Sequence, residues 1–376
     1  MSTGGTEVAP PADPIDVVLG RDGIYRSCAE EMPLSRAELV WRAVRSHRET
    51  NDAYDRYCVR QGLPDQDDPE LPLDRVPLLP TVLFKRDPAL VLSKGGTPPL
   101  TDTTSSGTLG TVSTVPRCDA TLMRFFGTVA IGDREILGSE TFDRAVFNVG
   151  PTIHDAPNLW IAMVMAGVGV IMPSRSYLDE ERLLAEELAR DLQRDGRDRN
   201  VLLVGPPPLL LDLARVAAQD TRLRLGPGSQ VLTIGGWKRR GGEMVEKAAF
   251  RSLMADAFGL ERDDQVRDTY NMVELNSVLF ECAHHALHVP PWLAAMARDP
   301  RTLAVLPSGA GGLLSFLDPT AVSYPCFILT DDFGSVRYDA HCACGMAGDT
   351  VTIERRVNRV ESRGCALKLD VEGRSS

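Results

Sequence analysis

A run of small, hydroxylated and glycine residues, TTSSGTLGTVST at 103–114, is the first place where this sequence offers chemistry. Backbone N–H groups and hydroxyls in such a loop bind phosphate oxygens. Gly107 and Gly110 permit close backbone approach and unusual φ/ψ values. The run does not end in the Gly-Lys-Ser/Thr sequence of a Walker loop. On composition alone, a phosphate-binding loop and a plain surface loop are both open.

Two short segments rich in cysteine and histidine are candidates for a metal site, ECAHHALH at 281–288 and HCACG at 341–345. Two thiolates one residue apart suit a tight turn, and a Cys/His pair from elsewhere in the chain would complete a tetrahedral zinc set. The alternative is a group of reduced cysteines beside a histidine-rich helix end. The candidate ligands are Cys282, His284, His285, His288, His341, Cys342 and Cys344.

A third candidate is Cys365, which lies in the cationic segment RVNRVESRGCALKLD at 356–370. Nearby positive charge lowers a thiol pKa from about 8.5 and raises the thiolate fraction. The cationic neighbours in sequence are Arg356, Arg359, Arg363 and Lys368. A nucleophilic thiol and a buried strand cysteine both fit this pattern, because CALKLD alternates as a strand does.

The composition is that of a globular protein of 376 residues with a formal net charge of −11, which disfavours a nucleic-acid partner. No apolar run reaches the roughly 20 residues needed to span a bilayer. The first residues lack the basic and apolar regions of a secretory signal, so we expect a cytoplasmic protein without disulfides. A lysine used in chemistry has few candidates, namely Lys85, Lys94, Lys238, Lys247 and Lys368.

The elements that must position these residues alternate between helix and strand. Residues 34–62 are predicted to be helical, with Ser35 and Glu38 as a capping box. Proline punctuates an extended segment at 71–85. Helix-and-strand alternation through the middle of the chain predicts an α/β fold with a largely parallel sheet, followed after about residue 300 by short strands and turns. The alternating helices and strands are predicted in the segments 158–172, 180–196, 200–219, 230–237 and 243–259.

Five motifs in order over about 260 residues resemble those of adenylate-forming enzymes, the superfamily of acyl-CoA synthetases and luciferases. SSGTLGTVS resembles their phosphate loop, with Val112 and Ser113 where Pro and Lys usually stand. The motifs TIGGWK, DTYNMVELN, YPCFILTDDFG and IERRVNRVESRG follow it. The resemblance implies nucleotide-binding roles for Ser105, Ser106, Gly107, Thr108, Gly110, Gly235, Gly236, Trp237, Tyr270, Asp332 and Arg356.

In the resembled enzymes the aromatic residue of the third motif lies against adenine, and its Glu, here Glu274, helps to hold Mg²⁺. The aspartate of the fourth motif, here Asp332, binds the ribose hydroxyls. Trp237 either covers the adenine or packs in the core. Lys238 is the best-placed substitute for a catalytic lysine, and the alternative is a surface residue at a strand end.

Nearly the full length of the chain resembles the LuxE-type acyl-protein synthetases, through VPLLPTVLFK, SSGTLG, GGWK, HVPPW, SYPCFILTDDFG and ESRGCAL. The implied fold is the large α/β domain of adenylate-forming enzymes with a smaller β-rich part and without the mobile C-terminal lid that carries a catalytic lysine. We expect four parts: a disordered tail at 1–18, a helical segment at 19–98, an adenylation core at 99–352 and a truncated hinge at 353–376.

The resemblance implies ATP and Mg²⁺ as cofactors, and activation of a carboxylic acid, a fatty acid by family likeness, as an acyl-adenylate. The acyl group then passes to Cys365 as a thioester and on to a reductase or carrier protein. Relatives in the phenylacetate–CoA ligase branch resemble the Cys/His pattern and bind zinc there. This favours Cys282, His288, Cys342 and Cys344 as structural zinc ligands and leaves His341 spare.

Two alternatives remain. An adenylate-forming ligase would pass an aryl or short acyl group to CoA, a carrier protein or an amine, with Cys365 as a bystander. A nucleotide-binding or scaffold protein that has lost catalysis would explain the altered phosphate loop. Pyrophosphate release with a carboxylic acid would exclude the second alternative.

Overall fold

The computed structural model describes residues 13–27, 31–64, 71–96, 98–106, 112–138, 144–171, 174–179, 182–196 and 199–356. The α-helices are α1 (Pro14–Leu19), α2 (Arg36–Thr50), α3 (Asp52–Arg60), α4 (Leu83–Arg86), α5 (Asp119–Glu135), α6 (Trp160–Ile171), α7 (Ala185–Asp195), α8 (Pro207–Ala217) and α9 (Lys247–Phe258). The 3₁₀ helices are η2 (Leu73–Arg75), η3 (Pro88–Val91), η4 (Thr221–Leu223), η5 (Lys238–Glu243) and η6 (Asp263–Gln265).

The strands are β1 (Leu79–Pro80), β2 (Leu100–Thr104), β3 (Thr114–Cys118), β4 (Arg144–Asn148), β5 (Ser174–Ser176), β6 (Leu178–Asp179), β7 (Arg182–Leu183), β8 (Asn200–Gly205), β9 (Gln230–Thr233), β10 (Val266–Tyr270), β11 (Leu279–Glu281), β12 (Leu287–His288), β13 (Ala294–Arg298), β14 (Gly311–Leu317), β15 (Phe327–Arg337) and β16 (Thr350–Arg356).

One twelve-stranded mixed sheet organises the fold, in the order β13-β14-β15-β16-β12-β11-β10-β9-β8-β4-β5, with β1 beside β15. The strands from β10 to β5 pair in parallel. The strands from β13 to β10 pair antiparallel. The expected largely parallel sheet is therefore correct for only one half. Parallel pairing needs long crossovers, whereas β10 to β16 follow one another without an intervening α-helix.

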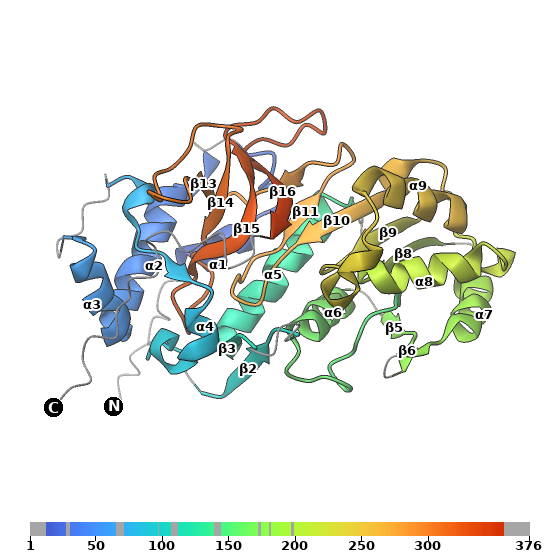
Figure 1. Cartoon of the computed structure of the whole chain (residues 1–376), viewed down its shortest axis with the longest axis horizontal. Coiled ribbons are helices and arrows are strands. Elements are labelled where there is room, and N and C mark those ends of the chain that lie inside the picture. The colour runs from blue at the N-terminus through green and yellow to red at the C-terminus, as the bar shows by residue number, and fades with distance from the viewer. Residues whose placement is uncertain are drawn as a thin grey trace, which may run out of the picture.

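Helices cover the two halves differently (Figure 1). Helices α6 to α9 lie with the parallel strands, to the right in Figure 1, and α1 to α4 lie at the opposite end with the antiparallel strands. The long helix α5 runs between these groups. Two hydrophobic cores are present. The larger one, around Trp292 and Phe327, also includes α5, α6 and one set of alternate residues of β4, β8 and β9. The other, around Leu203 and Phe258, packs α7, α8 and α9 on the remaining residues of these three strands.

The predicted helix at 34–62 is two helices. Its capping box is present, since the Glu38 N–H donates to Ser35 Oγ at 3.2 Å and the Ser35 N–H donates to Glu38 Oε2 at 2.7 Å. The break falls at Asn51, whose side chain accepts hydrogen bonds from Ala53 and Tyr54 N–H. Asparagine is among the best N-cap residues, so it ends α2 and starts α3.

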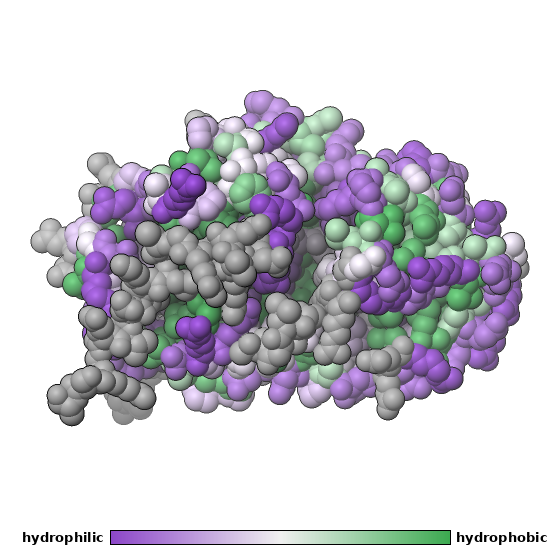
Figure 2. All heavy atoms as spheres, viewed as in Figure 1, coloured by the Kyte–Doolittle hydropathy of each residue, from purple (hydrophilic) through white to green (hydrophobic). Residues whose placement is uncertain are grey.

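Figure 2 shows one face of the molecule, on which apolar side chains gather toward the end formed by α7, α8 and α9. Exposed apolar residues of these elements and the turn before α9 include Val216, Met244 and Leu253. Among the described residues, no helix is both long enough and apolar enough to span a bilayer.

A buried histidine joins α2 to the sheet and predicts a pH dependence. His47 donates from Nε2 to the Ala321 carbonyl at 3.2 Å and accepts at Nδ1 from the Ser93 hydroxyl at 2.9 Å. Burial lowers the pKa of His47 from 6.5 to about 4. The unfolded chain therefore takes up a proton below pH 6.5 that the folded chain takes up only near pH 4, and stability falls as the pH falls across this window.

We expect this group to make the protein about 2 kcal/mol less stable at pH 5 than at pH 7. The variant His47→Gln removes the titration, so its free energy of unfolding in urea should change less between these two pH values. An equal change in both proteins would contradict the assignment.

Candidate active site and metal cluster

The hydroxyl-rich run joins β2 to β3, which form an antiparallel pair. At its base the Ser105 N–H donates to the Ser113 carbonyl at 3.0 Å, and the Ser113 N–H donates to Ser105 Oγ at 3.0 Å. Ser106 follows in the described chain. The predicted contact residues Gly107, Thr108 and Gly110 lie outside the described residues. These two hydrogen bonds hold Ser105 and Ser113 together at the base of the run.

Three predicted side chains from distant segments lie together on the twelve-stranded sheet, at β10, β15 and β16. The Tyr270 hydroxyl donates to Asp332 Oδ2 at 2.8 Å, and Arg356 Nε lies 3.9 Å from Asp332 Oδ1. The pairing of β15 with β16 places Asp332 opposite Arg356. Burial raises the pKa of Asp332, and Arg356 opposes this rise. An aromatic face, a carboxylate and a guanidinium in one place suit a nucleoside, through stacking and hydrogen bonds to its hydroxyls.

Glu274 lies four residues after Tyr270 and is only 3 % exposed. Its backbone carbonyl accepts hydrogen bonds from the Tyr324 hydroxyl at 3.2 Å and the Cys326 thiol at 3.1 Å, which fix the loop after β10. Burial raises the pKa of the Glu274 carboxyl, and the Ser113 hydroxyl, Lys85 and Arg356 oppose the rise. A buried carboxylate beside the phosphate-loop base can hold a divalent cation, because Mg²⁺ prefers oxygen ligands.

Lys85 is near enough to the candidate site to influence the pKa of Glu274, although the sequence assigned it no role. It lies in α4, which follows β1, and β1 pairs with β15. Thr81 Oγ1 donates to Asp331 Oδ2 at 3.0 Å, while Phe84 packs edge-on against Tyr324 with ring centroids 6.0 Å apart. These contacts bring α4 to the segment that carries Glu274. The available signal was the lysine at the end of VPLLPTVLFK.

The predicted glycine turn follows β9. Gly235 has a φ of +84°, and a Cβ there would lie 2.9 Å from Ile161 Cδ1, so both conformation and space call for glycine. Gly236 is exposed. Trp237 lies edge-on to Phe250, with ring centroids 5.9 Å apart, which is the packing contact that one alternative expected. Lys238 begins η5, and its side chain lies outside the described part of the structure.

The four favoured zinc ligands converge on one point. Their ligand atoms all lie within 4.8 Å of one another, and the set is Cys282, His288, Cys342 and Cys344. The Sγ atoms of Cys282 and Cys342 are 3.7 Å apart, and Cys344 Sγ lies 3.3 Å from His288 Nε2. Sulfur ligands about 2.3 Å from a tetrahedral zinc lie about 3.8 Å apart, so the spacing fits.

The four groups of this cluster differ in their protonation, and hydrogen bonds from its neighbours lower the pKa of Cys342 against the effect of burial. Burial raises the pKa of the Cys282 thiol and raises that of Cys344 to about 12. Burial lowers the pKa of His288 to about 4, which keeps its imidazole neutral. A divalent cation would favour the thiolates that burial alone disfavours. Among the described residues, His284, His285 and His341 do not belong to the converging set.

Cys365 falls outside the described residues, so the structure gives no geometry for it. Arg356, at the end of β16, is the last described residue. Cys365 follows Arg356, a member of the Tyr270–Asp332–Arg356 group, nine residues later in the sequence.

Comparison with known proteins decides the family. The family model described as acyl-protein synthetase, LuxE, matches residues 5–372. The chain belongs to the LuxE acyl-protein synthetase family. This membership confirms the predicted family and makes the chain an ATP-dependent, AMP-forming ligase of the acyl-protein synthetase type, as the sequence indicated.

Relatives support the same family over most of the chain. A long-chain-fatty-acid–luciferin-component ligase of Vibrio harveyi is 34% identical over 344 residues, which cover 90% of this chain and 88% of the relative. A protein of the same description from Aliivibrio fischeri is 32% identical over 346 residues, covering 90% of this chain and 89% of the relative.

Solved structures confirm the fold of this LuxE-family chain. A 2-hydroxyisobutyryl-CoA ligase in complex with 2-HIB-AMP and CoA has a TM-score of 0.66 at 14% identity, covering 89% of this chain and 70% of that one. An open conformation of that ligase has a TM-score of 0.62 at 15% identity, covering 85% and 74% of the two chains. The predicted adenylate-forming architecture is thus correct.

Proposed function

We propose that this protein activates a long-chain fatty acid with ATP as an acyl-adenylate, transfers the acyl group to its own Cys365, and hands it to a partner reductase. The single observation that supports adenylation best is the convergence of Tyr270, Glu274, Asp332 and Arg356 from three separate segments. The fatty acid and the partner class rest on the relatives named as luciferin-component ligases.

In the first step, a carboxylate oxygen of the acid attacks the α-phosphorus of ATP. The bond from that phosphorus to the oxygen bridging to the β-phosphorus breaks, and pyrophosphate leaves. Tyr270 would lie against the adenine, Asp332 and Arg356 would bind the ribose hydroxyls, and the loop that begins at Ser105 would hold the β- and γ-phosphates. Glu274 would hold Mg²⁺, which neutralises phosphate charge in the transition state.

In the second step, the Cys365 thiolate attacks the acyl carbon of the adenylate. A carbon–sulfur bond forms, the carbon–oxygen bond to phosphate breaks, and AMP leaves. A short segment beyond β16 links Arg356 to Cys365, which favours delivery of this thiol to the nucleotide site. A thiol of the partner would then accept the acyl group and return Cys365 to its free form.

We propose a structural zinc ion at the cluster of Cys282, His288, Cys342 and Cys344. Four protein ligands leave no open coordination position, so the ion would stabilise rather than react. The cluster joins the β11–β12 hairpin to the connection before β16, and β12 itself pairs with β16. The ion would therefore help to hold the strand that ends in Arg356.

The defining experiment measures pyrophosphate release from ATP and Mg²⁺ with long-chain, short-chain and aromatic carboxylic acids in parallel. We expect long-chain acids to stimulate release most. Stimulation by an aromatic or short acid instead would overturn the fatty-acid assignment. Absence of release with every acid would favour a binding protein without catalysis.

Lys85 is expected to supply positive charge that the altered phosphate loop lacks. The loop has Ser113 where a lysine is usual, and the Lys85 ammonium favours the ionised form of Glu274. The variant Lys85→Met should lower the rate of pyrophosphate release about 10-fold or more, with partial recovery in Lys85→Arg. The matched control is Lys94→Met, because Lys94 pairs with exposed Asp52 at 3.1 Å. Equal rates in the Lys85 and Lys94 variants would contradict this role.

A further inference from the structure

A fully buried arginine, Arg117, lies in β3 directly after the hydroxyl-rich run, with 0% of its surface exposed. Its Nε donates to Asn276 Oδ1 at 3.1 Å. One terminal nitrogen donates to the Thr103 hydroxyl. The other donates to the Val273 carbonyl at 2.6 Å and the Tyr324 hydroxyl at 3.1 Å. Every one of these acceptors is neutral.

Stability does not account for a charge at this position. Within the described chain Arg117 makes no ion pair, although Glu274 and Asp318 favour its charged form from farther away, and burial lowers its pKa. Burying a cation costs several kcal/mol, and an apolar residue of similar volume is often neutral or stabilising by comparison. A role in the reaction would account for retaining a guanidinium here.

The side chain of Arg117 contacts segments whose positions relative to one another matter for adenylation. Thr103 stands two residues before Ser105, at the stem of the phosphate loop, and Val273 immediately precedes Glu274. The guanidinium carbon also lies 3.7 Å from the ring centre of Trp160, the first residue of α6. One planar group thus joins the phosphate-loop stem, the Glu274 segment and the start of α6.

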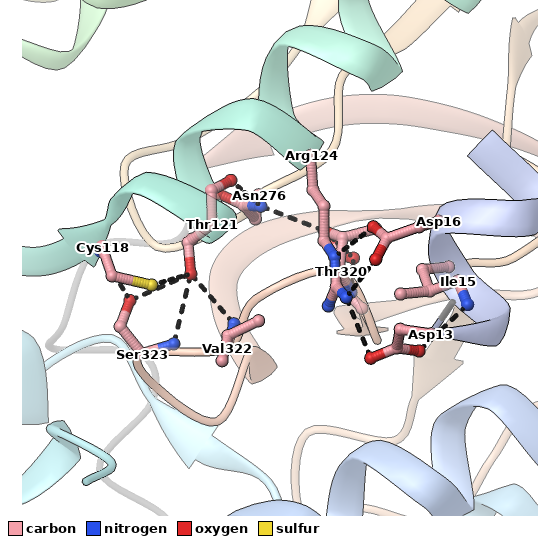
Figure 3. A network of polar contacts seen from close by, with 11 residues as sticks. Asp13, Ile15, Asp16, Cys118, Thr121, Arg124, Asn276, Thr320, Val322 and Ser323 are labelled. Carbon is pink, nitrogen blue, oxygen red and sulfur yellow. Dashed lines mark hydrogen bonds and ion pairs between the residues drawn. The ribbon is translucent and has the colours of Figure 1, made fainter. Parts of the chain in front are cut away.

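Another partner of Arg117, Asn276, is itself fixed in place (Figure 3). Its amide nitrogen donates to the Thr121 carbonyl at 3.0 Å and to Thr320 Oγ1 at 3.1 Å. The Thr121 hydroxyl accepts from the N–H groups of Val322 and Ser323 at 2.9 and 3.2 Å. Arg117 is therefore anchored to the first turns of α5 and to the turn before β15.

We propose that Arg117 is a positioning residue for adenylation, which fixes the phosphate-loop stem against the Glu274 segment. This proposal rests on the proposed function. The planar fork of arginine fixes several acceptors at once, which a lysine ammonium does not reproduce. A shift of about 1 Å in reacting groups lowers a rate about 100-fold, so loss of the fork acts on the chemical step.

The test compares Arg117→Lys with Arg298→Lys. Arg298 is a second buried arginine, 4% exposed, that donates to Ser315 Oγ at 2.9 Å and to the Leu303 carbonyl at 3.0 Å. It lies in β13, at the far edge of the sheet from the parallel half. Both variants replace a buried guanidinium that donates several hydrogen bonds. Arg298→Lys therefore reports the effect of lost stability alone.

We expect kcat for pyrophosphate release to fall about 100-fold in Arg117→Lys and less than about 3-fold in Arg298→Lys, with similar losses in Tm. The KM for ATP should change less than kcat. Arg117→Met, which also removes the charge, should be at least as slow as Arg117→Lys. Equal rates in Arg117→Lys and Arg298→Lys, or an active Arg117→Met, would overturn the positioning role.

Wild-type protein separates this proposal from the proposed function. If it releases pyrophosphate and Arg117→Lys matches the Arg298 control, only the role of Arg117 is wrong. If wild-type protein neither releases pyrophosphate nor gains thermal stability with ATP, both proposals are wrong.

Discussion

Substitution of Glu274 by glutamine is expected to lower ATP-dependent pyrophosphate release by about 10²- to 10³-fold. The amide keeps the size of the side chain but loses the negative charge that would hold Mg²⁺ beside the phosphate loop. Glu274 is 3% exposed and its pKa is raised by burial, so the neutral amide also relieves a desolvation cost.

The raised pKa of Glu274 also predicts how Glu274→Gln changes the stability of the fold. A carboxyl whose folded pKa is raised contributes stability in its protonated form, and this contribution is lost as the pH rises through the folded pKa. Glu274→Gln cannot ionise, so in the absence of ligands its Tm at pH 8 should equal or exceed that of wild-type protein.

A suitable control is Glu281→Gln. Glu281 is also buried with a raised pKa, but it pairs with Arg251 and accepts from the Asp268 N–H at 2.8 Å. We expect this variant to lose stability and keep most of its adenylation rate. A Glu274→Gln protein that is folded and fully active would remove Glu274 from the reaction.

Loss of the metal cluster is the second large expected effect. Purified protein should contain about one zinc per chain, and Cys282→Ser should contain none. We expect Tm to fall by about 5 °C or more, which corresponds to about 4 kcal/mol or more for a chain of this size. Metal analysis by mass spectrometry and thermal unfolding measure the two effects.

The matched control is Cys58→Ser, since Cys58 is fully buried in α3 and lies outside the cluster. This variant should keep its zinc. Because β12 pairs with β16, zinc loss should also weaken ATP binding at the end of β16 near Arg356. Zinc-free wild-type protein with an unchanged Tm would contradict a structural ion.

The residues that we propose for nucleotide binding could be selected from the sequence because each belongs to a short motif whose residue types suit that chemistry. Tyr270 and Glu274 lie in one motif, and Asp332 in another, and the sheet brings both motifs together. The choice of His288 over its neighbours was also made from the sequence, and the 3.3 Å between His288 Nε2 and Cys344 Sγ places its side chain against the cysteines.

Residues without a local motif were not predictable in the same way. Arg117 gains its importance from acceptors 156 to 207 residues away in sequence, and Lys85 from the placement of α4 beside β15. The β-rich part was predicted only after about residue 300 and without a pairing direction, whereas the antiparallel strands begin with β10 and β11, before that point. The break at Asn51 was readable, since Asn51 starts a helix with Asp52 and Asp55 in its first turn.

The most direct test of acyl transfer to Cys365 is the intact mass of the protein after incubation with ATP, Mg²⁺ and a long-chain fatty acid. Wild-type and Cys58→Ala proteins should gain one acyl group that hydroxylamine removes, and Cys365→Ala should gain none while still releasing pyrophosphate. An unmodified wild-type mass despite pyrophosphate release, or an acyl adduct that persists in Cys365→Ala, would contradict transfer to Cys365.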